Sequence, residues 1–157
     1  MTPREFLDQV VRPNVAEFHA DYGDERRAFN AVAAVDALAA HMYLWCQANN
    51  RAAIHGVADD SSYRAGLAQQ DAKFGLLRDI AKAQKHVRLT RNPPPVANAS
   101  QMNARTPGYG EGRYGEGRYG GVLQVVVDIS GNDFAYIENV MDVALAFLEG
   151  KMQQLGM

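Results

Sequence analysis

Five side chains of the types that move protons or hold anions lie within about three helical turns of this sequence. They are Arg78, Asp79, Lys82, Lys85 and His86. On a helix, Arg78, Lys82 and His86 follow an i, i+4, i+8 ridge, and Asp79 lies almost in line with His86. A carboxylate beside an imidazole, with cations to hold an anion, suits proton transfer near neutral pH. Arg78, Asp79 and His86 are therefore candidate catalytic residues, and Lys82 and Lys85 are candidate binding residues.

The same residues also fit a solvated helix face. Local pairs of Asp79 with Lys82 and Arg78 would contribute a few tenths of a kcal/mol each. Lys85 and His86 also suit the negative end of the helix dipole without any active site. The spacing leaves both interpretations open.

Asp36 is a further candidate binding residue because it falls inside an apolar stripe, between Val32 and Ala39. A buried carboxylate needs a partner, and Arg78 or Lys85 on the following helix could supply it. The pair would form either a polar site between two helices or a structural ion pair that fixes their register.

Other site types find less support, and we expect neither a metal site nor a cofactor. Cys46 is the sole cysteine and has apolar neighbours, which indicates a buried thiol. His19, His41 and His55 do not show the spacing of a histidine–carboxylate metal site in a helical bundle. The glycines between residues 108 and 121 do not separate a strand from a helix, as a phosphate-binding loop requires.

The segment from residue 92 to 121 is rich in proline and glycine, and Gly-Arg-Tyr-Gly occurs in it twice. We interpret it as a flexible loop. An RNA contact is the alternative, because Arg113 and Arg118 alternate with tyrosines that could stack on bases. Glu111 and Glu116 offset that positive charge.

Composition indicates one soluble globular domain over residues 1–157. The chain is 47% hydrophobic and 22% charged, with a net charge of -2, so no overall field attracts nucleic acid or an anionic membrane. The start of the sequence does not resemble a signal peptide. Asn30, Asp36 and His41 interrupt the longest apolar run, which favours a buried helix over a membrane span. The expected compartment is the cytoplasm.

The periodicity predicts a mainly α fold, an up-down bundle of about four helices with one short β element and a long Gly/Tyr/Arg loop. The helices are expected at residues 3–19, 25–49, 61–89 with a possible break near Gly66, and 133–155. Residues 122–129 are rich in β-branched side chains and form the expected strand. This strand needs a partner, either residues 87–90 or the same strand of a second copy.

A homodimer is expected from the apolar surface. The helix over residues 25–49 has its main stripe at Phe29, Val32, Ala39, Tyr43 and Cys46. Leu38 and Trp45 lie on another side of it. The last helix carries Val140, Val143 and Phe147 beside its own stripe, and such uncovered apolar surface is typical of a partner interface.

The end of the third predicted helix resembles a group of uncharacterised bacterial and phage helical proteins with an Asp-Ile-Ala-Asn-Ala-x-Lys-His-x-x-Leu motif. The matching residues are Asp79, Ile80, Ala81, Ala83, Lys85, His86 and Leu89, and Lys82 replaces the Asn. A weaker similarity is to HEPN domains, whose motif places four to six residues between an Arg and a His. Here Arg78 and His86 enclose seven.

These observations favour a non-catalytic binding or accessory protein with a protein or RNA partner. The alternative, which the HEPN similarity implies, is a ribonuclease of the toxin or defence type that uses Arg78 and His86. The placement of His86, either in a cleft beside Arg78 or packed against a neighbouring helix, distinguishes the two.

Overall fold

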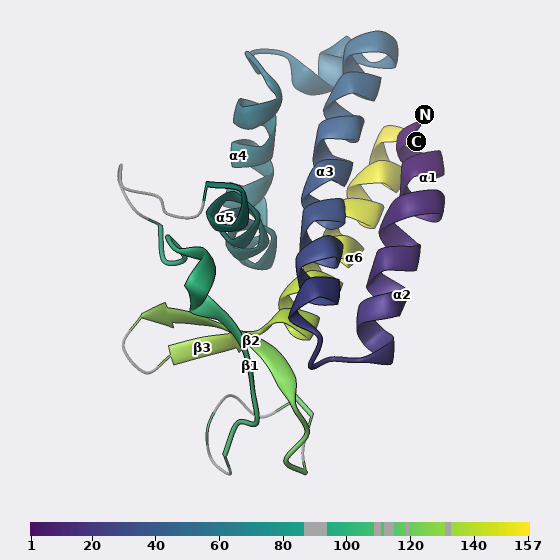
Figure 1. Ribbon diagram of the computed structural model, residues 1–157. Helices are drawn as coiled ribbons and strands as arrows, with labels where there is room; N and C mark the ends of the chain where they lie inside the picture. The colour runs from purple at the N-terminus through teal and green to yellow at the C-terminus, as the bar shows by residue number, and fades with distance from the viewer. Residues whose placement is uncertain (87–93, 109–110, 112–114, 119, 131–132) are drawn as a thin grey trace.

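A computed structural model describes residues 1–86, 94–108, 111, 115–118, 120–130 and 133–157. The chain is mainly helical, as the sequence predicts, and the one predicted strand is part of a small antiparallel sheet. In Figure 1 a long central helix, α3, has α1 and α2 on one side and α4 and α5 on the other, with α6 behind it. The sheet lies across one end of these helices, and the two chain ends lie close together.

The first predicted helix is present, and it contains a π-helical turn. α1 (Pro3–Phe6) continues through η1 (Leu7–Val11) into α2 (Arg12–Ala20). Thr2 caps the start together with Glu5, each side chain accepting from the other residue's backbone N–H, at 3.2 and 2.7 Å. Pro13 has no N–H to donate, and the wider turn directly before it accommodates this without ending the helix.

α3 (Glu25–Asn49) begins and ends where the sequence predicts, with Asp24 as its cap. It is the central helix of the core, and most of its apolar residues are buried. By length and composition it could also cross a membrane, although half of its most apolar window is buried within this chain. One predicted core residue is wrong: Phe29 faces outward and is 42% exposed.

The third predicted helix is two helices, α4 (Asp60–Gln70) and α5 (Ala72–His86), which follow the short 3-10 helix η2 (Arg51–Ile54). The break is at Asp71 and not near Gly66. Asp71 has extended backbone angles, and its carboxylate accepts from the N–H of Phe74 at 2.7 Å, which starts α5. The predicted continuation to Leu89 lies outside the described residues.

The sheet corrects two predictions about the strand. β2 (Gln124–Ser130) pairs on one side with β1 (Met102–Arg105) and on the other with β3 (Asp133–Tyr136), all antiparallel. Neither a second copy nor residues 87–90, which lie outside the described part, are needed as partners. β1 and the short helix η3 (Ala99–Gln101) arise within the predicted 92–121 loop. β3 occupies what was predicted as the start of the last helix.

α6 (Ile137–Leu155) packs its buried face, from Ile137 to Met152, on α3 and α5. The surfaces expected to support a dimer are largely covered within the chain: Leu38 and Val140 are fully buried, and Phe147 lies against Phe74 with ring centroids 6.1 Å apart. Burial inside one chain therefore accounts for Leu38, Val140 and Phe147, while Val143 remains 38% exposed, and the homodimer stays a prediction.

Candidate functional site

Polar side chains gather where α3, α4 and α5 meet. We call this set the polar seam, and it consists of Asp36, Asp60, Arg64, Arg78 and Lys82. Arg64 is its centre: Nη1 lies 2.7 Å from Asp36 Oδ2, while Nε and Nη2 reach the two Asp60 oxygens at 2.8 and 3.1 Å. The predicted partners of Asp36, Arg78 and Lys85, are therefore wrong, although the predicted buried ion pair exists. Asp60 precedes Arg64 by one turn of α4, which places its carboxylate within reach of the Arg64 guanidinium. The Asp36 carboxylate, on α3, reaches the same guanidinium.

The Asp36 carboxylate is more enclosed than its partner Arg64 and than Asp60. Its side chain is 15% exposed and that of Arg64 is 24% exposed. Burial raises the pKa of Asp36, and the nearby charges of Arg64 and Arg78 oppose that rise. Asp36 Oδ1 is buried and has no hydrogen-bond partner among the described residues, so the ion pair satisfies only one of its two oxygens.

Arg78 and Lys82 differ from Arg64 because no described carboxylate accepts a hydrogen bond from either. Arg78 Nη2 donates to the carbonyl and hydroxyl oxygens of Ser61 at 3.0 and 3.4 Å. The buried Arg78 Nε has no acceptor among the described residues. Burial lowers the pKa of Lys82 and the charge of Arg78 lowers it further, while Asp79 counteracts both. Burial likewise raises the pKa of Asp79, opposed by Lys82 and Arg78.

Lys85 and His86 lie at the exposed end of α5. His86 follows Arg78 by eight positions, which is about 12 Å along a helix axis. Among the described residues neither Lys85 nor His86 hydrogen-bonds to the seam. The structure thus brings Asp36, Arg78 and Lys82 into one region around Arg64, and it leaves Lys85 and His86 apart from it.

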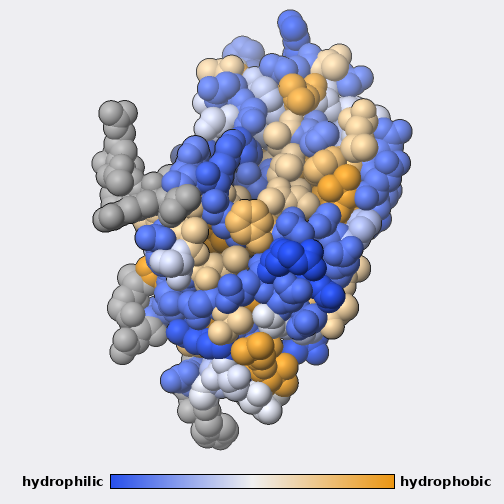
Figure 2. Space-filling view, in the orientation of Figure 1, coloured by the Kyte–Doolittle hydropathy of each residue, from blue (hydrophilic) through white to orange (hydrophobic). Residues whose placement is uncertain are grey.

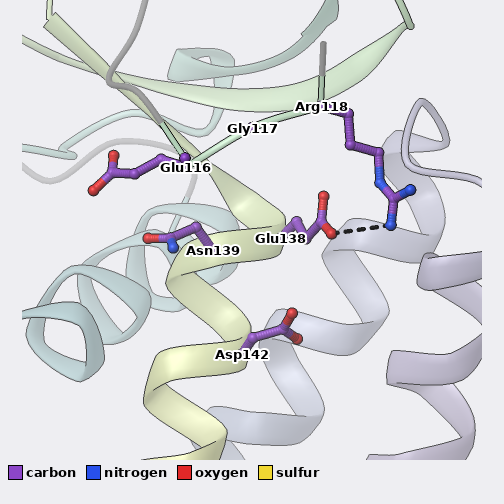
Figure 3. Close-up of a pocket in the computed structure, with 7 residues that line it drawn as sticks. Glu116, Gly117, Arg118, Glu138, Asn139 and Asp142 are labelled. Atoms are coloured by element: carbon purple, nitrogen blue, oxygen red, sulfur yellow. Dashed lines mark hydrogen bonds and ion pairs between the residues drawn. The ribbon is translucent and has the colours of Figure 1, made fainter.

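A second polar region was not foreseen from the sequence. It is a hollow of about 340 Å³ beside the start of α6, lined by Gly115, Glu116, Gly117, Arg118, Glu138, Asn139 and Asp142. Figure 3 shows Glu138 turned toward Arg118, with Glu116 and Asn139 pointing to the opposite side. Arg118 Nη2 lies 3.3 Å from Glu138 Oε1. Its guanidinium also bonds to the Tyr22 hydroxyl and covers the Tyr22 ring, 4.0 Å from the centroid.

The other two carboxylates of this hollow also have basic partners. His19 Nε2 lies 3.0 Å from Asp142 Oδ1, and Lys73 Nζ lies 3.4 Å from Glu116 Oε1. Each carboxylate of the hollow thus lies within 3.4 Å of a basic side chain of the same chain. Among the residues that the structure describes, no three His, Cys, Asp or Glu side chains gather as a metal site would require.

Gly117 and Arg118 of the second Gly-Arg-Tyr-Gly repeat are held to the sheet, which the sequence did not indicate. The Gln124 side chain, in a residue only 3% exposed, accepts from the N–H of Arg118 at 2.8 Å and donates to its carbonyl at 3.0 Å. Gly117 lies flat on the ring of Tyr136, where a Cβ would approach Cζ to 2.3 Å. In the sequence, the available signal for this anchoring was a single glutamine, Gln124, at the start of β2. Most of the first repeat lies outside the described residues.

Cys46 is fully buried, as the sequence predicts, and burial raises the pKa of its thiol. Its surroundings are apolar, with Tyr43 and Ile54 in the same buried cluster. A thiol in this setting acts as a small hydrophobic side chain.

No family model, curated protein or solved structure matches this chain.

Proposed function

We propose that the protein is a non-catalytic binding or accessory protein that captures an acidic protein segment at the polar seam. The observation that carries this proposal is the state of Arg78 and Lys82. They lie one turn apart on α5, they face the same region as Arg64, and neither donates to a carboxylate among the described residues. Two partly buried cations of this kind are suited to an incoming carboxylate.

The three cations of the polar seam contribute differently to this binding. Arg64 is already saturated by Asp36 and Asp60, so it fixes the wall of the seam and contributes little to a ligand. Arg78 Nε is buried and Nη2 donates to Ser61, so the outer guanidinium edge with Nη1 is the part of Arg78 that can donate to an incoming carboxylate. Lys82 adds a compact charge with three donors. Partial burial strengthens both attractions relative to bulk water.

A protein segment is favoured over RNA by the carboxylates around these cations. Asp36, Asp60 and Asp79 limit the positive potential of the seam, and the whole chain has a net charge of -2. Nucleic-acid binding depends on neutralising several phosphates at once. A short acidic peptide needs no more than two or three cations.

The test is fluorescence anisotropy with a labelled hexaglutamate peptide at low and at physiological salt. Replacing both seam cations, as Arg78→Gln together with Lys82→Gln, should weaken binding about tenfold or more, since hydrogen bonds to charged groups contribute about 1.5–3 kcal/mol each. Lys85→Gln is the matched control, because Lys85 lies on the same helix outside the seam, and it should change affinity less than twofold. Absence of binding by the unmodified protein, or equal losses in control and double variant, would overturn the proposal.

The ribonuclease alternative rests on His86, which is exposed at the end of the helix that carries Arg78. An exposed imidazole is accessible to a substrate, and imidazole is a side chain that can transfer protons. Incubation with single-stranded RNA tests it. Cleavage that is lost in both His86→Ala and Arg78→Gln would establish the nuclease; intact RNA would dismiss it.

A further inference from the structure

A five-residue unit, Glu-Gly-Arg-Tyr-Gly, occurs twice in direct succession in the loop that joins β1 to β2. The first unit is residues 111–115 and the second unit is residues 116–120. This loop lies at the lower end of the molecule in Figure 1. On the face that Figure 2 shows, pale and blue residues surround one orange group at that end. The contacts available to the loop on this face are therefore largely polar.

The second unit is held through three successive residues, Glu116, Gly117 and Arg118. Glu116 Oε1 lies 3.4 Å from Lys73 Nζ, and more than two thirds of each side chain is buried. Gly117 lies so close to the Tyr136 ring that an added Cβ would meet Cζ at 2.3 Å. The first two positions therefore select a carboxylate followed by a residue without a side chain.

The third position selects an arginine. The Arg118 guanidinium covers the Tyr22 ring at 4.0 Å from the centroid, and Nη2 lies 3.3 Å from Glu138 Oε1. A cation is attracted both by the ring face and by the carboxylate. The Gln124 side chain accepts from the Arg118 N–H at 2.8 Å and donates to its carbonyl at 3.0 Å, which fixes the backbone. We call the residues that hold the second unit the loop-binding site: Tyr22, Lys73, Gln124, Tyr136 and Glu138.

We propose that the loop-binding site is a receptor for the sequence Glu-Gly-Arg and that the first unit is its alternative occupant, which enters when the loop shifts by five residues. Glu-Gly-Arg occurs in these two units and nowhere else in the chain. The shift would place Glu111 beside Lys73. It would place Arg113 between Tyr22 and Glu138. Each contact that selects the second unit is therefore available to the first.

The lengths of the two connections permit this exchange. In the observed register ten residues join β1 to the bound Glu-Gly-Arg and five join it to β2, and the shift reverses these numbers. The entropic cost of closing the connections is therefore about the same in both registers. Arg105, which ends β1, pairs with Gln124, which begins β2. Five residues, which span up to ~17 Å, already join the site to Gln124, so five residues should also reach it from the adjacent Arg105.

The glycines that end the two units already have similar backbone angles. The φ angles of Gly115 and Gly120 are 82° and 98°. Left-handed angles of this kind suit glycine and are unfavourable for residues with a Cβ. After the shift Gly115 would take the place of Gly120 with little change in this angle.

One set of contacts favours the observed register. Glu111 accepts from the N–H of Gly108 at 2.8 Å, and its own N–H bonds to the Gly108 carbonyl at 3.1 Å. Both bonds would break when Glu111 moves to Lys73. Since these bonds are exposed, their loss should favour the observed register by about tenfold. The shifted register is then a minor state of roughly one molecule in ten. It is independent of the polar seam, which shares no residue with the loop-binding site.

Disulfide trapping in a Cys46→Ala background distinguishes the two registers. Arg118→Cys with Glu138→Cys reports the observed register, and Arg113→Cys with Glu138→Cys reports the shifted one. Glu111→Cys with Glu138→Cys is the matched control, because position 111 would lie beside Lys73 after the shift. In Figure 3 the present partner of that lysine points away from Glu138. Cross-linking at low protein concentration, measured by mass spectrometry of digests, should be within about tenfold as fast for Arg113→Cys as for Arg118→Cys. It should be much slower for Glu111→Cys.

Two glycine variants should change the cross-linking of Arg113→Cys in opposite directions. Gly117→Ala excludes the second unit from the Tyr136 ring and should speed this cross-linking up to tenfold. Gly112→Ala excludes the first unit in the same way and should slow it to the rate of Glu111→Cys. Helical circular dichroism confirms that each variant is folded. An Arg113→Cys variant that cross-links no faster than Glu111→Cys, or two glycine variants with the same effect, would overturn the inference.

Discussion

Replacing Arg64 with methionine should destabilise the fold by about 2–3 kcal/mol. The substitution keeps an aliphatic stem of similar length but leaves the Asp36 carboxylate without its cation. Removing one partner of a fully buried pair costs about 3–5 kcal/mol. Here the side chains of Asp36 and Arg64 are 15% and 24% exposed, and Arg78 lies close enough to compensate part of the charge. These two factors place the expected cost at the lower end of that range or below it.

The assay is urea unfolding monitored by circular dichroism. The free energies of unfolding are compared between variants whose m value, the dependence on urea concentration, is the same. Asp60→Asn is the control, because it removes the more exposed carboxylate that pairs with Arg64. This variant should lose less than about 1 kcal/mol, the contribution of an i, i+4 ion pair together with the helix dipole. Replacing the whole pair, as Asp36→Leu with Arg64→Met, should restore stability to within about 1 kcal/mol of the original. A loss below about 1 kcal/mol in Arg64→Met, or additive losses in the double variant, would refute the reasoning.

The pH dependence of this variant follows from the raised pKa of Asp36. A group whose pKa is raised in the folded state takes up its proton there before it does so in the unfolded chain. The folded state is then favoured as the pH falls, so the loss caused by Arg64→Met should shrink on acidification from neutral pH. A loss that is constant with pH would show that desolvation of the carboxylate is not its cause.

Four other predictions concern two glycines, the anchoring glutamine and a buried tyrosine. Gly117→Ala should destabilise by about 1–3 kcal/mol, because its Cβ would lie 2.3 Å from the Tyr136 ring. Gly66→Ala in α4, where an added Cβ would have no neighbour within 4 Å, should stabilise by about 0.5–1 kcal/mol in the same unfolding assay. A Gly66→Ala variant that is less stable than the Gly117→Ala variant would contradict these contacts. Gln124→Leu should cost about 2 kcal/mol by leaving two backbone groups unpaired, and faster proteolysis near residue 118 would accompany it; an unchanged cleavage rate would argue against the anchoring role. Burial raises the pKa of Tyr63 to about 12, so stability should fall as the pH rises from about 10 toward 12, and Tyr63→Phe should remove the last step of the ultraviolet tyrosine titration.

The sequence predicted the starts of two helices from their capping residues. Thr2 and Asp24 both cap the helices that were expected to begin beside them. Asp71 carries the same kind of signal, yet the continuous apolar pattern on both sides of it indicated one helix. Gly66 was the weaker cue, since an isolated glycine is tolerated within a helix.

The sheet and the partner of Asp36 were harder to predict because both depend on long-range contacts. Strand β1 has only four residues, and its pairing with β2 joins positions 19 to 25 residues apart. The buried setting of Asp36 followed from the apolar stripe, but its partner depended on the angle at which α4 returns along α3. Arg64 is on the polar side of α4 in the sequence pattern, and nothing local distinguishes it from a solvated arginine.

The exposed side of α3 also escaped sequence analysis. Phe29 and Leu38 both belong to apolar rows of one helix, and periodicity alone cannot say which row faces the core. The structure buries Leu38 and exposes Phe29. Neighbouring helices decide this, since α1, α2, α4, α5 and α6 cover all other sides of α3.

Charge reversal at the polar seam is the most direct test of the proposed function. Arg78→Glu with Lys82→Glu should abolish binding of hexaglutamate and create binding of a hexalysine peptide, because the sign of the charges that meet the ligand is inverted. Such a switch in preference, measured by anisotropy on a variant that keeps its helical circular dichroism, is the expected result. Unchanged affinity for hexaglutamate in this variant would contradict the proposal that Arg78 and Lys82 hold an acidic partner.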